Sequence, residues 1–322
     1  YFPGARARFR RETDVVSRLH DPGIVAVHEV GEADGVPFLA MELVDGKTLE
    51  QVIGTGRRLR QHQQPLTGEQ IDQATDRATR AEDLGTWLET SVAWTARIAR
   101  SLDHAHERGV LHRDIKPSNL MLARDGRLLV MDFGLAAAEG TGSLTRTGTQ
   151  LGSLPYMAPE LLLSGARDAT VRSDVYSLGV VLYELLALTA PFGAGNTDAV
   201  RDLVLAANPT PLRAHDPSIP RDVATVVAKA MDRDPSRRYP TMERFAADLD
   251  NLRSGSPIHA RPSSVWLKLA RSARRHPTRY TAALLGAALL VAAPLMHVVG
   301  ARSERDAAVW SSYRAQLSAA AV

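Results

Sequence analysis

The chain has 322 residues, of which 44% are hydrophobic and 23% are charged, and its formal net charge is +3. This length indicates one or two domains, and this composition excludes a protein that is disordered throughout. Cysteine is absent, which excludes disulfides, thiolate metal sites and a cysteine nucleophile. The arginines are interleaved with acidic residues and aromatic residues make up only 5%, so the small positive charge does not favour a nucleic-acid-binding protein.

The first part of the chain alternates between two kinds of pattern. Apolar residues in 8–19 recur at helical spacing, and Asp21-Pro22-Gly23 ends the predicted helix. Two β-rich runs follow, Ile24–Val30 and Val36–Val44. The glycine-bearing segment 31–35 between these runs predicts a hairpin.

The rest of the globular part is predicted to be mostly helical. Residues 54–86 are polar and rich in Arg and Gln, which indicates a surface insertion that is helical around Thr67–Asp83. Apolar spacing returns over Trp87–Arg108 and predicts a long helix that ends at Gly109. Short strands are expected at 110–111, 120–122 and 128–131, and helices at 171–188, 196–207, 220–231 and 241–253.

Three short motifs follow one another in a fixed order. They are His112-Arg113-Asp114-Ile115-Lys116-Pro117-Ser118-Asn119, Asp132-Phe133-Gly134 and Ala158-Pro159-Glu160. Each motif alone is weak evidence. In this order and spacing, after a hairpin and a long helix, the probability that all three occur by chance is negligible. Together they resemble the protein-kinase catalytic domain, and the lysine of the first motif is typical of bacterial Ser/Thr kinases of the eukaryotic (Hanks) type. The resemblance runs from about residue 5 to residue 254.

This resemblance implies an α+β, two-lobed protein-kinase fold. The N-lobe, residues 1–46, would be incomplete, and the C-lobe, residues 47–254, would be mostly α. The implied reaction transfers the γ-phosphate of ATP, bound with Mg²⁺, to a Ser or Thr hydroxyl of a protein substrate.

The first two motifs supply the residues that phosphoryl transfer needs. Asp114 would orient the acceptor hydroxyl, and Lys116 would neutralise charge on the transferred phosphate. Asn119 and Asp132 carry the hard oxygen ligands that Mg²⁺ prefers. The alternative is that Asp114 and Asp132 only cap turns, and the order and spacing of the three motifs strongly disfavour it.

The resemblance also implies an adenine site on the hairpin. Met41 would be the gatekeeper, backbone groups of Glu42 and Val44 would bond the base, and Met121 would lie under the adenine ring. Without the motifs, Met41 and Met121 are more often core residues. Glu12 would be the helix glutamate that pairs with the family's phosphate-holding lysine.

Other residues match structural positions of the family. His112 and Phe133 belong to the motifs themselves, and Arg238 resembles the arginine that pairs with Glu160. Asp174 opens a predicted helix and resembles the acidic residue that braces the catalytic loop.

The segment between the second and third motifs is rich in hydroxyl groups. Arg113, beside the catalytic aspartate, marks kinases that phosphorylation of this loop switches on. We expect autophosphorylation at Thr145 and Thr147, in a homodimer. Ser153 is expected to contact substrate.

Two nucleotide-binding elements of the family are absent from the sequence. No glycine-rich loop precedes the first helix, and no lysine occurs in residues 1–46. Either the sequence is a fragment of a true kinase, which the intact motifs favour, or it is a membrane-anchored pseudokinase scaffold. In both cases we expect this polypeptide to be nearly inactive.

The C-terminal part has a membrane-like pattern. Residues 281–300 carry no charge, and as a helix they would span about 30 Å, the hydrocarbon thickness of a bilayer. We expect a juxtamembrane linker at 255–279, a transmembrane helix at 280–300 and the start of an extracytoplasmic region at 301–322. Because the linker is basic, the positive-inside rule predicts a single-pass protein of the inner membrane with a cytoplasmic kinase domain. The alternative is a buried, Ala-rich core helix.

Overall fold

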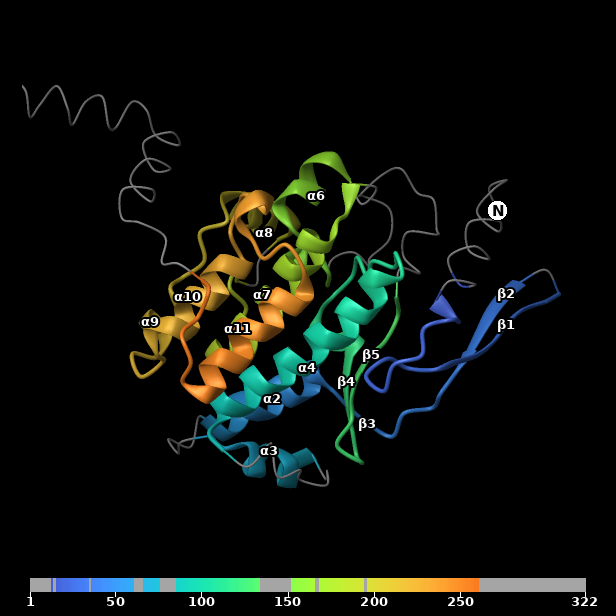
Figure 1. The fold of residues 1–322 in the computed structure, drawn as a ribbon, viewed down its shortest axis with the longest axis horizontal. Coiled ribbons are helices and arrows are strands. Elements are labelled where there is room, and N and C mark those ends of the chain that lie inside the picture. Colours follow the sequence, from blue (N-terminus) through green and yellow to red (C-terminus); the bar gives the residue numbers. More distant parts are fainter. Residues whose placement is uncertain are drawn as a thin grey trace, which may run out of the picture. The chain divides into compact units, whose positions relative to one another are not determined.

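The computed structural model describes residues 13, 16–34, 36–60, 66–75, 85–133, 152–165, 168–193 and 196–260. The chain divides into two units, Tyr1–Pro262 and Ser263–Val322, and every described residue belongs to the first (Figure 1). The predicted helix over 8–19 lies mostly outside the described residues, although Thr13 and Val16 are helical.

A hairpin begins the described part of the chain, as the sequence predicts. Strand β1, Val27–Ala33, pairs antiparallel with β2, Val36–Met41. The turn is shorter than predicted because β1 continues through Gly31. The Phe38 ring covers that glycine so closely that an added Cβ would lie 2.3 Å from the Phe38 ring, and a cross-strand aromatic ring can compensate for glycine in a strand.

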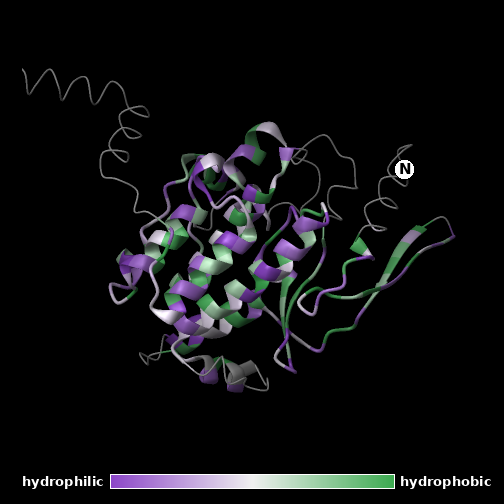
Figure 2. Cartoon of the chain, viewed as in Figure 1, coloured by the Kyte–Doolittle hydropathy of each residue, from purple (hydrophilic) through white to green (hydrophobic). Residues whose placement is uncertain are grey.

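A second sheet carries the loops that bear the motifs. Its strands are β3 (Gly46–Thr48), β4 (Leu120–Ala123) and β5 (Leu128–Val130), paired antiparallel in that order. The paired parts of β4 and β5 are hydrophobic (Figure 2) and, except for the half-buried Met121, buried. The two predicted strands here are confirmed.

The strand predicted at Val110-Leu111 is wrong. The Val110 amide donates to the Ala105 carbonyl at 3.0 Å, and Gly109 has a φ of +76°. These features belong to a helix C-terminus that ends in a left-handed glycine, so the segment is the exit from the preceding helix.

The predicted insertion begins too early. Residues 54–60 are the second half of α2, Leu49–Arg60, in which Leu49, Val52 and Ile53 are buried. Helix α3, Gly68–Thr75, lies where part of the insertion is predicted to be helical. Residues 61–65 and 76–84 lie outside the described part of the chain.

The helices of the larger lobe pack around α4, Trp87–Glu107, and α7, Val171–Ala187. Helix α4 starts at a capping box, in which the Thr86 hydroxyl accepts the Glu89 amide and the Glu89 carboxylate accepts the Thr86 amide. The remaining helices are α6 (Pro159–Ser164), α8 (Thr197–Ala206), α9 (Leu212–His215), α10 (Arg221–Ala230) and α11 (Met242–Ser254), with the 3₁₀ turns η2 (Pro117–Asn119), η4 (Leu154–Tyr156) and η6 (Pro235–Arg237).

The globular unit continues beyond residue 254, where the sequence predicts that a linker starts. Asp248 is fully buried in α11, and its carboxylate accepts the amides of His259 at 2.6 Å and Ala260 at 2.8 Å. Ala260 is itself buried in the hydrophobic core. The segment 255–260 is therefore packed onto the first unit.

None of the helices formed by described residues combines the length and the apolar character needed to cross a bilayer. The predicted span 280–300 and the flanking segments 261–279 and 301–322 lie outside the described residues.

Candidate active site

A buried carboxylate holds the loop that carries the first motif. Asp174, at the start of α7, accepts the amides of His112 and Arg113, each at 2.9 Å. Arg113 has a φ of +66°, and a non-glycine residue in this region costs about 1–3 kcal/mol. The two hydrogen bonds to one carboxylate offset that cost. Asp174 thus holds the loop, which is the role that the sequence predicts for it.

His106 is a further member of this brace. Its Nε2 lies 2.8 Å from Asp174 Oδ2, and the two side chains are 4% and 2% exposed. His106 was not among the predicted residues, because nothing in the α4 pattern distinguishes it from a core residue. The signal that could have revealed it is Asp174 itself, since a buried carboxylate requires several donors.

His112 joins the two loops of the site. Its Nε2 lies 2.9 Å from the Met131 carbonyl, and its Nδ1 lies 3.3 Å from the Asp114 amide. The ring therefore donates from Nε2 and accepts at Nδ1, which is the neutral form. Burial lowers the pKa of His112 and favours this form. The Phe133 ring packs on it at a centroid distance of 4.7 Å.

Three predicted residues of the first motif are brought together around one carboxylate. Lys116 Nζ donates to Asp114 Oδ2 at 2.7 Å, and Asn119 Nδ2 donates to the same oxygen at 3.1 Å and to the Asp114 carbonyl at 2.8 Å. Lys116 also lies 2.8 Å from the Ser153 hydroxyl. Both side chains use Oδ2, so Oδ1 is the oxygen of Asp114 that can face an acceptor hydroxyl.

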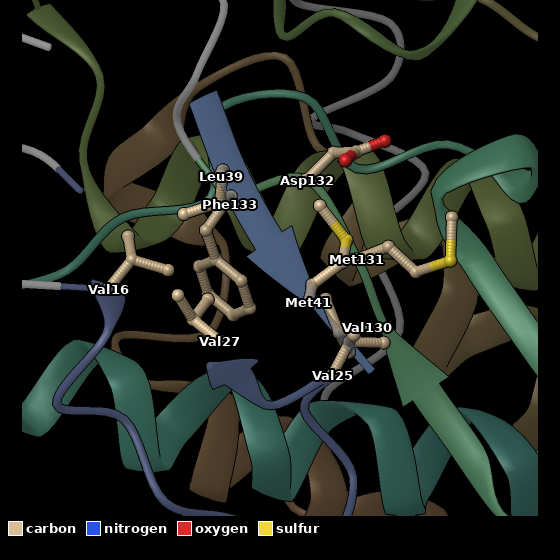
Figure 3. A pocket seen from close by; sticks show the side chains of 9 residues that line it. All are labelled: Val16, Val25, Val27, Leu39, Met41, Val130, Met131, Asp132 and Phe133. Carbon is tan, nitrogen blue, oxygen red and sulfur yellow. The ribbon is translucent and has the colours of Figure 1, made fainter. Parts of the chain in front are cut away.

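Asp132 lies on the neighbouring loop, beside Asn119. The Met131 amide donates to the Asn119 carbonyl at 2.9 Å, which ties the two loops together one residue before Asp132. Asp132 has a φ of +57° and an exposed side chain, whereas Phe133 is 3% exposed. Figure 3 shows the Asp132 carboxylate turned away from the Phe133 ring. The left-handed backbone thus separates a polar from an apolar side chain.

A small pocket, partly open to solvent, lies between the hairpin and this loop. Met41 and Asp132, which the sequence places in one nucleotide site, both line it. Its lining is apolar except for Asp132 (Figure 3) and consists of Val16, Val25, Val27, Leu39, Met41, Val130, Met131, Asp132 and Phe133.

Met121 and Val44 do not line this cavity. Both pack instead against a smaller hydrophobic cluster made by Val25, Ala123 and Leu129. Met131 packs against the same cluster and also lines the cavity, so the predicted adenine residues lie on two adjoining apolar surfaces.

Glu42 is held on both its backbone and its side chain. Its amide donates to the Ala26 carbonyl at 2.9 Å. Its carboxylate accepts from Arg127 Nη2 at 2.7 Å, while Arg127 Nε donates to Asp125 at 2.7 Å. The hydrogen bond from Arg127 lowers the pKa of the Glu42 carboxyl, and burial opposes this shift. Arg127 was not predicted as a site residue.

The ion pair expected between Glu160 and Arg238 is present. Two nitrogens of Arg238 donate to the two carboxylate oxygens of Glu160, each at 2.7 Å. The arginine is 2% exposed and also donates to the carbonyls of Asp232 and Arg172. A fork-shaped arginine in this setting fixes the start of α6 to the turn before α11.

Three predicted residues lie outside the described part of the chain. They are Glu12 of the first helix and the expected phosphorylation sites Thr145 and Thr147.

The sequence profile of the protein kinase domain matches residues 3–248 of this chain. The chain belongs to the protein kinase family. The serine/threonine-protein kinase PknJ of Mycobacterium tuberculosis is 38% identical over 247 residues, which are 75% of this chain and 37% of PknJ. A probable serine/threonine-protein kinase of Streptomyces coelicolor is 35% identical over 264 residues, which are 80% of this chain and 35% of that protein.

A solved kinase structure agrees with this membership. The crystal structure of the Mycobacterium tuberculosis PknI kinase domain matches with a TM-score of 0.54 and 27% identity, over 78% of this chain and 80% of that one. The protein-kinase fold, mixed α and β with a helical C-lobe, is thereby confirmed. The chain spans 35% to 37% of the length of the two curated relatives named above.

Proposed function

We propose that this kinase domain belongs to a protein serine/threonine kinase, which transfers the γ-phosphate of ATP to Ser or Thr hydroxyls of proteins. The observation that carries the proposal is the set of contacts around Asp114, which Lys116 and Asn119 both hold by one oxygen. The printed names of the relatives, serine/threonine-protein kinases, support the same reaction.

The first motif accounts for the acceptor side of this reaction. Asp114 would orient the incoming hydroxyl and accept its proton as the phosphoryl group arrives. Lys116, bonded to both Asp114 and Ser153, would stabilise negative charge on the phosphoryl oxygens. Because phosphoryl transfer depends on positioning and charge, the buried Asp174 brace under this loop supports the reaction without touching the substrate.

Asn119 and Asp132 fit a magnesium ion. The amide nitrogen of Asn119 donates to two oxygens of Asp114, so the amide oxygen of Asn119 is the atom that can bind a cation. Asp132 adds an exposed carboxylate on the neighbouring loop. Both are hard oxygen donors of the kind Mg²⁺ prefers, and the ion would supply charge neutralisation to the phosphates when bound.

The adenine base would lie against the segment that follows β2. The Glu42 amide is engaged by Ala26, so its carbonyl and the Val44 amide are the backbone groups that would bond the base. Met41 and Met121 would supply apolar contact to the ring.

A pseudokinase scaffold is the second candidate, and one observation favours it. No lysine occurs in residues 1–46, so this chain has no candidate for the family's phosphate-holding lysine. Its intact Asp114, Asn119 and Asp132 favour the enzyme, because a binding scaffold has no need of all three.

The test is transfer of labelled γ-phosphate to a protein acceptor. The 322-residue chain should transfer little, and the same chain preceded by strands bearing a glycine-rich loop and a lysine should transfer readily. Asp114→Asn in the longer protein is the matched control and should abolish transfer with the fold kept. A longer protein that binds ATP without transfer would favour the scaffold, and the kinase proposal would fail.

We further propose that residues 280–300 anchor the protein in the inner membrane, with the kinase domain in the cytoplasm. The uncharged stretch and its basic flank support this proposal. Extraction of membranes with alkaline carbonate should leave the protein in the pellet, and deletion of 280–300 should release it. Release of the intact protein would contradict the anchor.

Autophosphorylation within a homodimer is proposed for Thr145 and Thr147. The hydroxyl-rich segment and Arg113 beside Asp114 support it. Mass spectrometry of the active protein should find both threonines modified, and two unmodified threonines would contradict it.

A further inference from the structure

We propose that Arg127 is a positioning residue for nucleotide binding, because it fixes the Glu42–Asp45 segment that would bond the adenine base. The inference rests on the proposed function, and it names a residue outside the three motifs. It concerns the ion pair between Arg127, in the turn before β5, and Glu42, which directly follows β2.

The turn that carries Arg127 is itself well held. Arg127 Nε donates to Asp125 Oδ2 at 2.7 Å, and the Arg127 amide donates to Asp125 Oδ1 at 2.9 Å. Arg97 of α4 donates to the Gly126 carbonyl at 3.0 Å. The guanidinium is therefore presented from a turn fixed to the larger lobe.

From this turn, Arg127 reaches the segment after β2. Its Nη2 donates to Glu42 Oε1 at 2.7 Å, and the side chains of Arg127 and Glu42 are 35% and 26% exposed. The two partners are 85 residues apart in sequence. A planar guanidinium can serve Asp125 and Glu42 at once in fixed directions, which a lysine cannot do.

Two backbone hydrogen bonds hold the ends of this segment, and Val44 packs against the cluster of Val25, Ala123 and Leu129. The Glu42 amide donates to Ala26 at 2.9 Å, and the Arg124 amide donates to the Asp45 carbonyl at 2.8 Å. Between these anchors, Leu43 is 96% exposed and contributes no packing. The ion pair thus adds the side-chain contact that sets the direction of the Glu42 carbonyl.

A plain surface ion pair is the competing interpretation. Half-exposed pairs of this kind contribute little to global stability, so replacing Arg127 should leave the unfolding midpoint nearly unchanged under both interpretations. The two differ in local order. Only a positioning role predicts faster amide exchange at 42–45 and weaker recognition of the adenine edge.

The experiment compares the wild-type chain with Arg127→Gln, Arg127→Lys and the control Arg124→Gln. The Arg124 guanidinium lies 3.6 Å from the Asp45 carboxylate, which is a longer contact than the one between Arg127 and Glu42. Both side chains are mostly exposed. The probes are adenosine and inosine, measured by calorimetry, and hydrogen exchange at the amides of 42–45. Inosine lacks the exocyclic amine of adenosine, which would donate a hydrogen bond to the Glu42 carbonyl. Neither probe carries a phosphate, so neither needs a phosphate site.

We expect Arg127→Gln to weaken adenosine binding about 3- to 10-fold, to reduce the preference over inosine and to speed exchange at 42–45. Arg127→Lys should fall between it and the wild type, and Arg124→Gln should match the wild type. Unchanged adenosine affinity and exchange in Arg127→Gln would overturn the inference.

Failure of the proposed function gives a different result. If the wild-type chain binds no adenosine, the nucleotide site is wrong, and exchange alone then decides whether Arg127 orders the segment. Faster exchange confined to 42–45 would retain the structural part of the inference, and unchanged exchange would reject it.

Discussion

His112 is a buried imidazole whose two nitrogens are both satisfied only in the neutral form. Burial lowers the pKa of His112 below its ordinary value of 6.5. The unfolded chain therefore binds a proton more readily than the folded protein. The stabilising contribution is complete above about pH 6.5 and decreases as the pH falls below it.

We predict that the free energy of unfolding of the wild type decreases more steeply between about pH 7 and about pH 5 than that of His112→Phe. Phenylalanine keeps the ring contact with Phe133 but cannot titrate. Urea denaturation at several pH values measures this difference. Parallel pH profiles for the two proteins would contradict it.

Asp174 concentrates three donors on one buried carboxylate. In Asp174→Asn, the amide nitrogen replaces either Oδ1, which faces the Arg113 amide, or Oδ2, which faces the His112 amide and His106 Nε2. We predict a loss of about 2–4 kcal/mol in the free energy of unfolding, since hydrogen bonds to a charged group contribute about 1.5–3 kcal/mol each. The matched control is Asp250→Asn, at a half-exposed aspartate that pairs with Arg100, and it should cost less than about 1 kcal/mol. Equal losses in both variants would argue against the brace.

At the scale of elements, Asp248 of α11 determines where the kinase unit ends. Burial raises the pKa of its carboxyl, but hydrogen bonds from His259, Tyr239 and Ala260 outweigh burial and lower it. The stabilising contribution is therefore present above about pH 4 and is lost as the pH falls through the lowered value.

We predict that Asp248→Asn speeds amide exchange at His259 and Ala260 and exposes Arg253 to trypsin, because the segment 255–260 loses its anchor. The measurements are hydrogen exchange and timed proteolysis at neutral pH. His259→Ala is the control: it removes the contact of His259 Nδ1 with Asp248 Oδ1 at 3.0 Å but keeps both backbone donors, so its effect should be smaller. Slow exchange retained in Asp248→Asn would show that apolar packing of Ala260 suffices.

Long elements were predictable from sequence, and short ones were not. Helix α4 has 21 residues and α7 has 17, so their apolar periodicity outweighs any single exception. Strand β3 has three residues and helix α9 has four, which is too few for a period. The second half of α2 was predicted to belong to the polar insertion, because the residues that it buries, Thr55 and Gly56, are not large apolar ones.

For the whole molecule, the candidate site residues Asp114, Asn119 and Asp132 were predictable because they belong to two short motifs of the family that stand close together in the sequence. His106 and Arg127 were not, because their partners Asp174 and Glu42 lie 68 and 85 residues away. Such pairs form only when distant parts of the chain pack together, so no local sequence pattern predicts them.

If Asp114, Asn119 and Asp132 converge on a metal-bound nucleotide, ATP binding must depend on Mg²⁺ through these residues. Calorimetry of ATP binding to the 322-residue chain and to Asp132→Asn, with and without Mg²⁺, measures this dependence. We predict that Mg²⁺ strengthens ATP binding to the wild type at least about tenfold and has little effect in the variant, while adenosine binds both equally. ATP affinity with the same Mg²⁺ dependence in both proteins would show that Asp132 does not help to bind the metal ion of a bound nucleotide.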